Sequence, residues 1–123
     1  MVEIVELDKE VAFAEQLEAK EGPVISMNVH HVKPELMEPF LAAWAADGEI
    51  MRRQPGFISA QLYRGIAGSG VLIHYTVWES TENLKHAYNN PEFQTVLKQY
   101  PSGITASPHV FKPIAVPGIC VAF

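Results

Sequence analysis

Two runs with the composition of β-strands, separated by a glycine-rich segment, constrain the fold of this chain most strongly. Residues 57–64 and 71–78 are rich in β-branched and aromatic side chains. Residues 65–70, which lie between them, contain three glycines. Two such runs joined by a short glycine-containing loop predict an antiparallel β-hairpin. The other elements of the fold must therefore pack against this hairpin or extend it.

A strand and a long helix are predicted before the hairpin. Residues 24–32 alternate between apolar and polar side chains, as a half-buried strand does, and the run ends before Pro34. Proline suits the first turn of a helix, and the basic pair Arg52 and Arg53 suits the last turn. Between these ends lies an apolar stripe with helical spacing, made of Leu36, Met37, Phe40, Leu41 and Trp44.

Two helices and a last strand are predicted after the hairpin. Ser80 and Asn90 are good N-caps, and the helix that begins at Asn90 extends to about Gln99. Residues 101–107 are expected to form a loop, and residues 108–114 a short strand. The order strand, helix, strand, strand, helix, strand is that of a ferredoxin-like α+β fold with an antiparallel sheet.

The two ends of the chain differ from the central domain, which we place at residues 23–115. Residues 1–22 contain seven acidic side chains and two lysines, so this arm accounts for the net charge of −5. Within the arm, Asp8 is a predicted N-cap of a helix that ends before Gly22. Residues 116–123 form an uncharged, apolar tail.

Composition excludes several classes of function. The chain has 123 residues, enough for one domain with a substantial core. Its 14 acidic against 9 basic side chains argue against nucleic acids and anionic membranes as partners. No run has the length and apolar character of a membrane span, and no signal peptide is recognisable. A single cysteine, Cys120, cannot form an internal disulfide, which fits a cytoplasmic location.

Alternate residues of the predicted strands divide into two sets of different character. One set is almost entirely apolar and comprises Ile25, Met27, Val29, Ile58, Ala60, Leu62, Val71, Ile73, Tyr75 and Val77. The other carries neutral polar and aromatic groups and comprises Ser26, Asn28, His30, Ser59, Gln61, Tyr63, Leu72, His74, Thr76 and Trp78. A solvated sheet face normally carries charges, so the second set predicts an enclosed, uncharged cavity.

This uncharged set suits a flat, partly hydroxylated organic ligand, because aromatic walls supply contact area and a few neutral polar groups set the orientation. The same pattern also fits a polar subunit interface or a hydrogen-bonded core wall. The predicted helices can cover one face of the sheet. The other face then needs a second subunit, so we expect a homodimer.

Landmarks around the hairpin resemble those of a known family. The sequence RQPGF (residues 53–57) precedes the first hairpin strand, and WES (residues 78–80) follows the second. Together with NPEF (residues 90–93), they resemble the antibiotic biosynthesis monooxygenase family of dimeric α+β barrels, over about residues 23–115. The resemblance implies a dimeric barrel around a small substrate, on a fold that supports several functions.

Site residues follow from this resemblance by position. In the quinol and anthrone monooxygenases of the family, an asparagine and a tryptophan four residues later bound the oxygenation site; these positions hold His74 and Trp78. The family's tyrosine six residues beyond the tryptophan corresponds to Leu84, and its arginine in the following helix corresponds approximately to Lys98. The haem-degrading branch has its axial histidine nineteen residues past the tryptophan, where this chain has Leu97, so no haem is expected.

His74 is the predicted catalytic base, because an imidazole with a pKa of about 6.5 can accept a proton at pH 7, and Trp78 is predicted to stack on the substrate ring. The predicted substrate-binding residues are Asn28, His30, Gln61, Tyr63, Thr76 and Lys98. No metal is expected, because His30 and His31 point to opposite faces of a strand and the predicted cavity face lacks a carboxylate or thiolate. The sequence has no nucleotide-binding motif, so no cofactor is expected.

These features predict a cytoplasmic, homodimeric monooxygenase that oxidises a small quinol- or anthrone-type aromatic with dioxygen. One alternative is a non-catalytic barrel that binds a small molecule or serves in a stress response. Another is an isomerase in which His74 only shuttles a proton. Consumption of dioxygen separates the first hypothesis from both alternatives.

Overall fold

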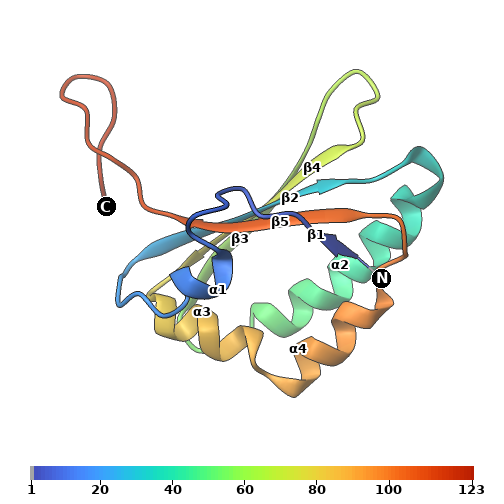
Figure 1. The fold of residues 1–123 in the computed structure, drawn as a ribbon, viewed down its shortest axis with the longest axis horizontal. Coiled ribbons are helices and arrows are strands. Elements are labelled where there is room, and N and C mark those ends of the chain that lie inside the picture. Colours follow the sequence, from blue (N-terminus) through green and yellow to red (C-terminus); the bar gives the residue numbers. More distant parts are fainter. Residues whose placement is uncertain (1) are drawn as a thin grey trace.

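The fold is a five-stranded sheet with helices packed against one of its faces (Figure 1). The structure is a computed structural model that describes residues 2–123. The strand order across the sheet is β1-β5-β2-β4-β3. In chain order, the elements are β1 (Glu3–Ile4), α1 (Phe13–Gln16), β2 (Val24–His31), η1 (Pro34–Leu36), α2 (Met37–Met51), β3 (Phe57–Arg64), β4 (Val71–Trp78), α3 (Thr81–Tyr88), α4 (Pro91–Val96), η2 (Leu97–Gln99) and β5 (Thr105–Phe111).

The predicted ferredoxin-like α+β fold is confirmed. Strand β2 pairs antiparallel with both β4 and β5, and β3 pairs antiparallel with β4. The short strand β1 pairs parallel with β5, which makes the complete sheet mixed. Figure 1 shows α2, α3 and α4 on one side of the sheet, while the β3–β4 hairpin and the C-terminal segment project on the other.

The predicted starts of α3 and α4 are also confirmed. The Ser80 hydroxyl oxygen accepts a hydrogen bond from the backbone N–H of Asn83 at 3.1 Å. The side-chain oxygen of Asn90 accepts one from the backbone N–H of Glu92 at 2.8 Å. Each cap satisfies an N–H group that has no partner within its helix. The second helix of the pair continues as the turn η2 to Gln99, as predicted.

The N-terminal arm and the last strand differ from the predictions. The helix predicted from Asp8 is reduced to the four residues of α1, and Asp8 instead accepts hydrogen bonds in a turn from the backbone N–H groups of Glu10 and Val11. Strand β5 begins before its predicted start at residue 108, because Thr105 already pairs with β2. Backbone pairing with a neighbouring strand outweighs the local signals of a loop here.

The predicted division of faces holds for β2 and β4 and is wrong for β3. Leu62 lies opposite His74 in the β3–β4 register, so it points toward the helices. Gln61 and Tyr63 therefore point to the outer face, away from His74. Because side chains alternate along a strand, a shift of one residue in pairing moves the whole set to the other face.

The core between the sheet and the helices consists of two apolar clusters, one around Trp78 and one around Phe40. Both side chains have no exposed surface. The Trp78 indole N–H donates to the Thr76 hydroxyl oxygen at 2.9 Å, which satisfies it inside the core. Leu41, predicted in the apolar stripe, is 39% exposed. Within residues 2–123, none of the helices combines the length and the apolar character needed to cross a membrane.

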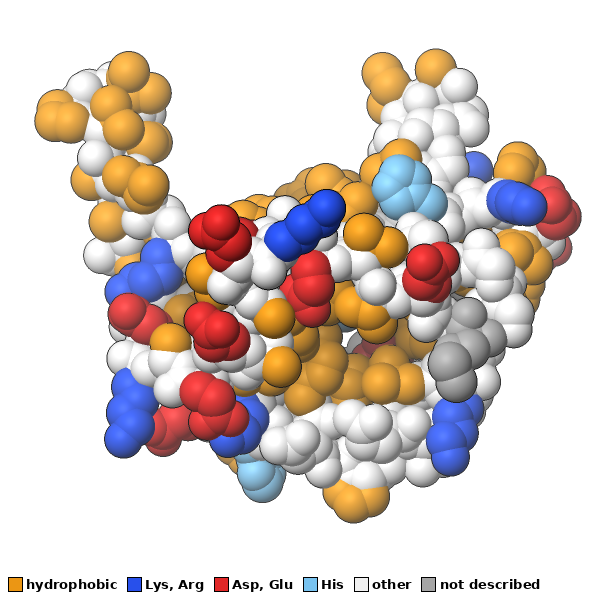
Figure 2. Space-filling model, viewed as in Figure 1, with side chains coloured by type: hydrophobic (Ala, Val, Ile, Leu, Met, Phe, Trp, Pro, Cys, Tyr) orange, Lys and Arg blue, Asp and Glu red, His pale blue; other side chains and the backbone are white. Residues whose placement is uncertain are grey.

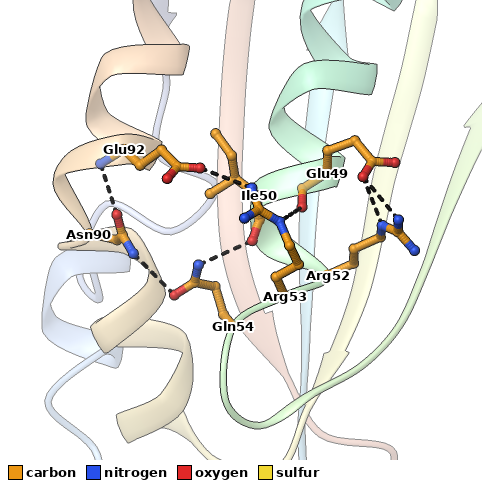
Figure 3. Close-up of polar contacts among 7 residues, drawn as sticks. All are labelled: Glu49, Ile50, Arg52, Arg53, Gln54, Asn90 and Glu92. Carbon is orange, nitrogen blue, oxygen red and sulfur yellow. Dashed lines mark hydrogen bonds and ion pairs between the residues drawn. The ribbon is translucent and has the colours of Figure 1, made fainter.

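Polar contacts join the end of α2 to the start of α4 (Figure 3). Arg53 donates to a carboxylate oxygen of Glu92 at 2.9 Å, and the Asn90 amide donates to the side-chain oxygen of Gln54 at 3.3 Å. Gln54 in turn donates to the Ile50 carbonyl at 3.1 Å. Four of these residues belong to the RQPGF and NPEF landmarks. The landmarks therefore hold together α2 and α4, two helices that border a cavity.

Candidate functional site

A cavity of about 540 Å³ lies between the helix-covered face of the sheet and the helices. Figure 2 shows a hollow between the strands and the helices, with hydrophobic side chains inside it. The apolar part of the cavity wall comprises Val2, Ile4, Met51, Phe93, Leu97, Ala106 and Pro108. The polar part comprises Asn28, His30, Asp47, His74, Tyr88, Gln94, Lys98, Tyr100 and Ser102.

The central strands contribute an amide and two imidazoles to the wall. Asn28 lies directly opposite His74 in the β2–β4 register, and His30 follows on the same face of β2. His30 is 5% exposed. Trp44 of α2 packs edge-on against His74, with ring centroids 5.6 Å apart. The sheet and α2 together therefore hold the His74 ring in place.

A carboxylate and a phenol face the cavity from the helical side. Asp47, in α2, is 4% exposed. Tyr100, which follows η2, donates from its hydroxyl to Asp47 Oδ2 at 2.7 Å. The Tyr100 ring also lies parallel to His30, with centroids 6.4 Å apart and planes inclined by 11°. Carboxylate, phenol and imidazole thus follow one another along the cavity wall.

Several side chains of this wall carry a buried polar atom without a hydrogen-bond partner among residues 2–123. These atoms are Asn28 Oδ1, His30 Nδ1 and Asp47 Oδ1. An unsatisfied buried polar atom costs about 1–3 kcal/mol. Amide and carboxylate oxygens only accept hydrogen bonds. A bound molecule that donates hydrogen bonds would therefore relieve this cost.

The two histidines in the wall are neutral at pH 7. Burial, with a smaller effect from nearby His30, lowers the pKa of His74 to about 4. Burial also lowers the pKa of His30 to about 4, although a hydrogen bond with the Thr105 backbone opposes this shift. A neutral imidazole can accept a proton, but one whose conjugate acid has so low a pKa is a weak base.

Asp47 titrates closer to neutral pH. Burial raises the pKa of its carboxyl to about 6, against the hydrogen bond from Tyr100, which lowers it. Burial, followed by the nearby charge of Asp47, raises the pKa of Tyr88 and of Tyr100 well above the usual range. Both phenols therefore remain protonated. Asp47 is mainly a carboxylate at pH 7 and can accept a proton there.

Half of the eight predicted site residues line the cavity, namely Asn28, His30, His74 and Lys98. The other half do not. Trp78 and Thr76 are buried in the core and hydrogen-bonded to each other, so Trp78 does not offer its ring to this cavity. Gln61 and Tyr63 are exposed on the outer face of the sheet.

The sequence interpretation missed Asp47 and Tyr100. Asp47 was detectable, because it lies seven residues after Phe40 and three before Ile50, on the buried face of α2. An acid in the middle of an apolar helix face needs a specific reason. Tyr100 carried no comparable signal, since it follows the predicted helix and precedes a predicted loop.

The arrangement can hold hydroxyl groups and receive a proton. Its hydrogen-bonding groups include two neutral imidazoles, the Asn28 amide and the Asp47 carboxylate, which lie beside apolar side chains. Within the described part of the chain, no group of three or more His, Cys, Asp or Glu side chains is placed to hold a metal ion. Lys98, which is exposed, supplies a positive charge to the wall.

Comparison with known proteins gives one family and a set of solved structures. A model of the family described as antibiotic biosynthesis monooxygenase matches residues 23–99. Curated protein sequences give no match. The solved structures include SnoaB, a cofactor-independent oxygenase from Streptomyces nogalater, which is 19% identical with a TM-score of 0.71; the match covers 80% of this chain and 99% of SnoaB.

Similar solved structures also come from other bacteria. A protein of Shewanella loihica PV-4, provisionally described as a monooxygenase, is 25% identical with a TM-score of 0.62, over 80% of this chain and 99% of its own. Rv0793 from Mycobacterium tuberculosis is 19% identical with a TM-score of 0.62, over 78% of this chain and 99% of its own. These likenesses show a shared fold over most of the chain.

Proposed function

Since this chain belongs to the antibiotic biosynthesis monooxygenase family, we propose that it oxidises a small quinol- or anthrone-type aromatic with dioxygen and without a cofactor. The cavity carries this proposal, because apolar walls and unpartnered polar atoms occur there together. The structural likeness to SnoaB, a cofactor-independent oxygenase, supports the reaction class. The shape and the polar groups of the cavity support the substrate class.

The cavity fits a molecule with an apolar ring system and hydroxyl groups on part of its edge. Its volume of about 540 Å³ lies within the range of about 300–1,000 Å³ that small-molecule sites occupy. Met51, Phe93 and Leu97 offer contacts to rings. The unpartnered oxygens of Asn28 and Asp47 would accept hydrogen bonds from hydroxyl groups.

Oxygenation without a cofactor requires a substrate that becomes electron-rich when it loses a proton. In an anthrone, the methylene carbon loses two hydrogens and four electrons. One atom of dioxygen becomes the new carbonyl oxygen, and the other leaves as water with the two hydrogens. Dioxygen is the sole oxidant in this balance. The protein has to receive the first proton, stabilise the anion and exclude bulk water.

We propose that His74 and Asn28 hold the substrate oxygen on which negative charge develops. A neutral imidazole can donate a hydrogen bond from its one N–H group, as an amide can from its NH2 group, so His74 can serve at the position where the family's quinol and anthrone monooxygenases have asparagine. No hydrogen bond from the described part of the chain occupies the His74 ring. The role of His74 as catalytic base stays a prediction. Its pKa of about 4 makes the imidazole a weak base.

We also propose that the protein acts as a cytoplasmic homodimer through its outer sheet face. Half-buried apolar side chains cover the middle of this face: Ile25, Met27, Val29, Ile73, Tyr75 and Val77. The hairpin tip, where Ile66 is 90% exposed, and the C-terminal segment, where Ile119 is 83% exposed, project from the same side (Figures 1 and 2). Adjoining apolar surface of this kind marks protein contacts. The net charge of −5 disfavours nucleic acid or an anionic membrane as the partner.

Oxygen uptake with a panel of hydroquinones and anthrones tests the proposed reaction. The wild-type protein is expected to consume dioxygen faster than each compound does alone. His74→Ala is expected to lower kcat/KM, because the substrate anion loses a hydrogen-bond donor. His86→Ala is the matched control, since His86 is exposed on α3 and is not among the residues that line the cavity.

The same assay distinguishes the alternatives. Tight binding of panel members without oxygen uptake would identify a non-catalytic binding barrel. Conversion of a ligand under anaerobic conditions would identify an isomerase. Equal turnover by wild type and His74→Ala would remove His74 from the proposed site while leaving oxygenation in place.

A further inference from the structure

We propose that Asp47 takes the proton from the substrate and that Tyr100 is its positioning residue. This inference rests on the proposed oxygenation and names the proton acceptor of its first step. Asp47 lies in the cavity wall on α2, opposite the strands that carry His30 and His74. The sequence motifs did not indicate it.

The two oxygens of the Asp47 carboxylate have different surroundings. Oδ2 accepts the hydrogen bond from the Tyr100 hydroxyl at 2.7 Å. Oδ1 is buried and has no hydrogen-bond partner within residues 2–123. One oxygen therefore holds the carboxylate in a defined orientation. The other keeps its lone pairs for a group that enters the cavity.

The charge of Asp47 is costly for the fold. Its side chain is 4% exposed, and none of the ion pairs formed within residues 2–123 includes it. A buried carboxylate without a cation destabilises a protein, and a neutral amide could also accept a hydrogen bond from Tyr100 without the cost of a buried charge. A carboxylate in this position is therefore better explained by acid–base chemistry than by packing.

The other titratable groups of the wall are less suited to receive the proton. Tyr100 and Tyr88, which face Asp47, stay protonated because their pKa values are raised. His30 and His74, across the cavity, are weak bases with pKa values of about 4. The Lys98 ammonium has no free acceptor site. The pKa of Asp47, about 6, leaves it unprotonated at pH 7 and makes it a stronger base than either imidazole.

The step is a simple proton transfer. With an anthrone, a C–H bond of the methylene group breaks, and its electron pair remains on the ring system as an enolate. The proton goes to Asp47 Oδ1, which becomes a carboxylic acid. The enolate then supplies electrons to dioxygen in the later steps. The proton leaves Asp47 with the water that the reaction forms.

Deuterium exchange under anaerobic conditions tests this step without the oxygenation. Anthrone is incubated with the protein in deuterated buffer, and loss of methylene hydrogen is followed by NMR above the protein-free rate. The wild-type rate is expected to fall as the pH drops below about 6, where Asp47 becomes protonated. Asp47→Asn, which retains the acceptor for Tyr100, is expected to lose about a hundredfold or more in rate.

Two further variants complete the experiment. Glu49→Gln removes an exposed acid from the same helix and is expected to exchange at the wild-type rate. Tyr100→Phe removes a hydrogen bond that lowers the pKa of Asp47. The acid limb of the variant's pH–rate profile, where the exchange rate falls as the pH drops, is therefore expected to move to higher pH. A merely structural Tyr100 would change the rate without moving this limb. This shift also tests the proposal if Asp47→Asn fails to fold.

The outcomes separate this inference from the proposed function. Wild-type exchange by a folded Asp47→Asn protein that still consumes dioxygen would overturn the role of Asp47 alone. An unmoved acid limb in Tyr100→Phe would overturn the positioning role of Tyr100. Exchange that depends on Asp47, without oxygen uptake, would support the proton acceptor and overturn the oxygenation. Absence of both activities in the wild type would overturn both.

Discussion

The titratable side chains buried around the cavity change the stability of the fold in opposite directions when the pH falls. His30 and His74 have folded-state pKa values of about 4, below the unfolded value of about 6.5. Acidification below that value therefore protonates the unfolded chain first and destabilises the fold. Asp47 has a raised pKa of about 6, so acidification protonates the folded state first and stabilises it. Each shift corresponds to at most about 3 kcal/mol.

The net effect on stability is a testable prediction. Two histidines oppose one aspartate, so the free energy of unfolding is expected to fall by up to about 3 kcal/mol between about pH 7 and about pH 4. Urea unfolding at several pH values measures this. His74→Gln should flatten the dependence, and Asp47→Asn should steepen it. Identical pH dependence in wild type and His74→Gln would show that His74 is not buried as described.

Individual site residues were only partly predictable from the sequence. Asn28, His30 and His74 reach the cavity because the alternation of β2 and β4 defines their face. Trp78 lies on the same face, but it is buried in the hydrophobic core and does not line the cavity. Asp47 belongs to a helix. The alternation of side chains along the strands does not show which helical residues face the sheet across the cavity.

At the scale of elements, close packing around the RQPGF landmark determines how the helices meet the sheet. Gly56 has a positive φ of 83°, and a Cβ atom there would collide with the Asn83 side chain of α3. Gly56→Ala is therefore expected to destabilise the protein by more than the roughly 1 kcal/mol that backbone strain alone costs. Thermal and urea unfolding measure the change.

Gly68 provides the matched control for this prediction. It also has a positive φ, of 78°, but a Cβ atom there would meet open space. Gly68→Ala should show the cost of backbone strain without the collision. Equal losses for the two variants would contradict the packing argument.

The strands and helices were predictable where local signals are strong. Caps and alternation located β2, α3, α4 and the hairpin, because each signal acts within a few residues. β1 and the early start of β5 were missed, since they depend on backbone pairing with a distant segment. The face of β3 was wrong because it depends on the register of the hairpin, and the six-residue loop allows more than one register.

At the scale of the whole molecule, the outer sheet face predicts self-association. Tyr75→Asp would place a charge in the middle of this face and is expected to produce monomers in analytical ultracentrifugation. Removal of residues 113–123 is expected to weaken the dimer, because it takes away an exposed apolar segment on the same side. His86→Asp, on the exposed surface of α3, is the control.

The wild-type result decides the dimer proposal. A wild-type protein that sediments as a monomer at micromolar concentration would contradict it. Dimers that persist in Tyr75→Asp would place the interface elsewhere on the molecule.

The overall fold was the most predictable level, because element order and chain length leave few arrangements. The position of the cavity was not predictable to the same degree. It depends on how α2, α4 and η2 lie over the sheet, and on Val2 and Ile4 of the N-terminal arm, which line the cavity. The arm, expected as an appended helix, thus contributes to the candidate site.

The measurement that tests the central claim most directly is the fate of isotopically labelled dioxygen. With anthrone as substrate, the account predicts one labelled atom in the new carbonyl group and the other in water, at a rate above the protein-free reaction. Asp47→Asn and His74→Ala should slow this incorporation, and Glu49→Gln should not. Incorporation no faster than without protein, across the panel of hydroquinones and anthrones, would contradict the account.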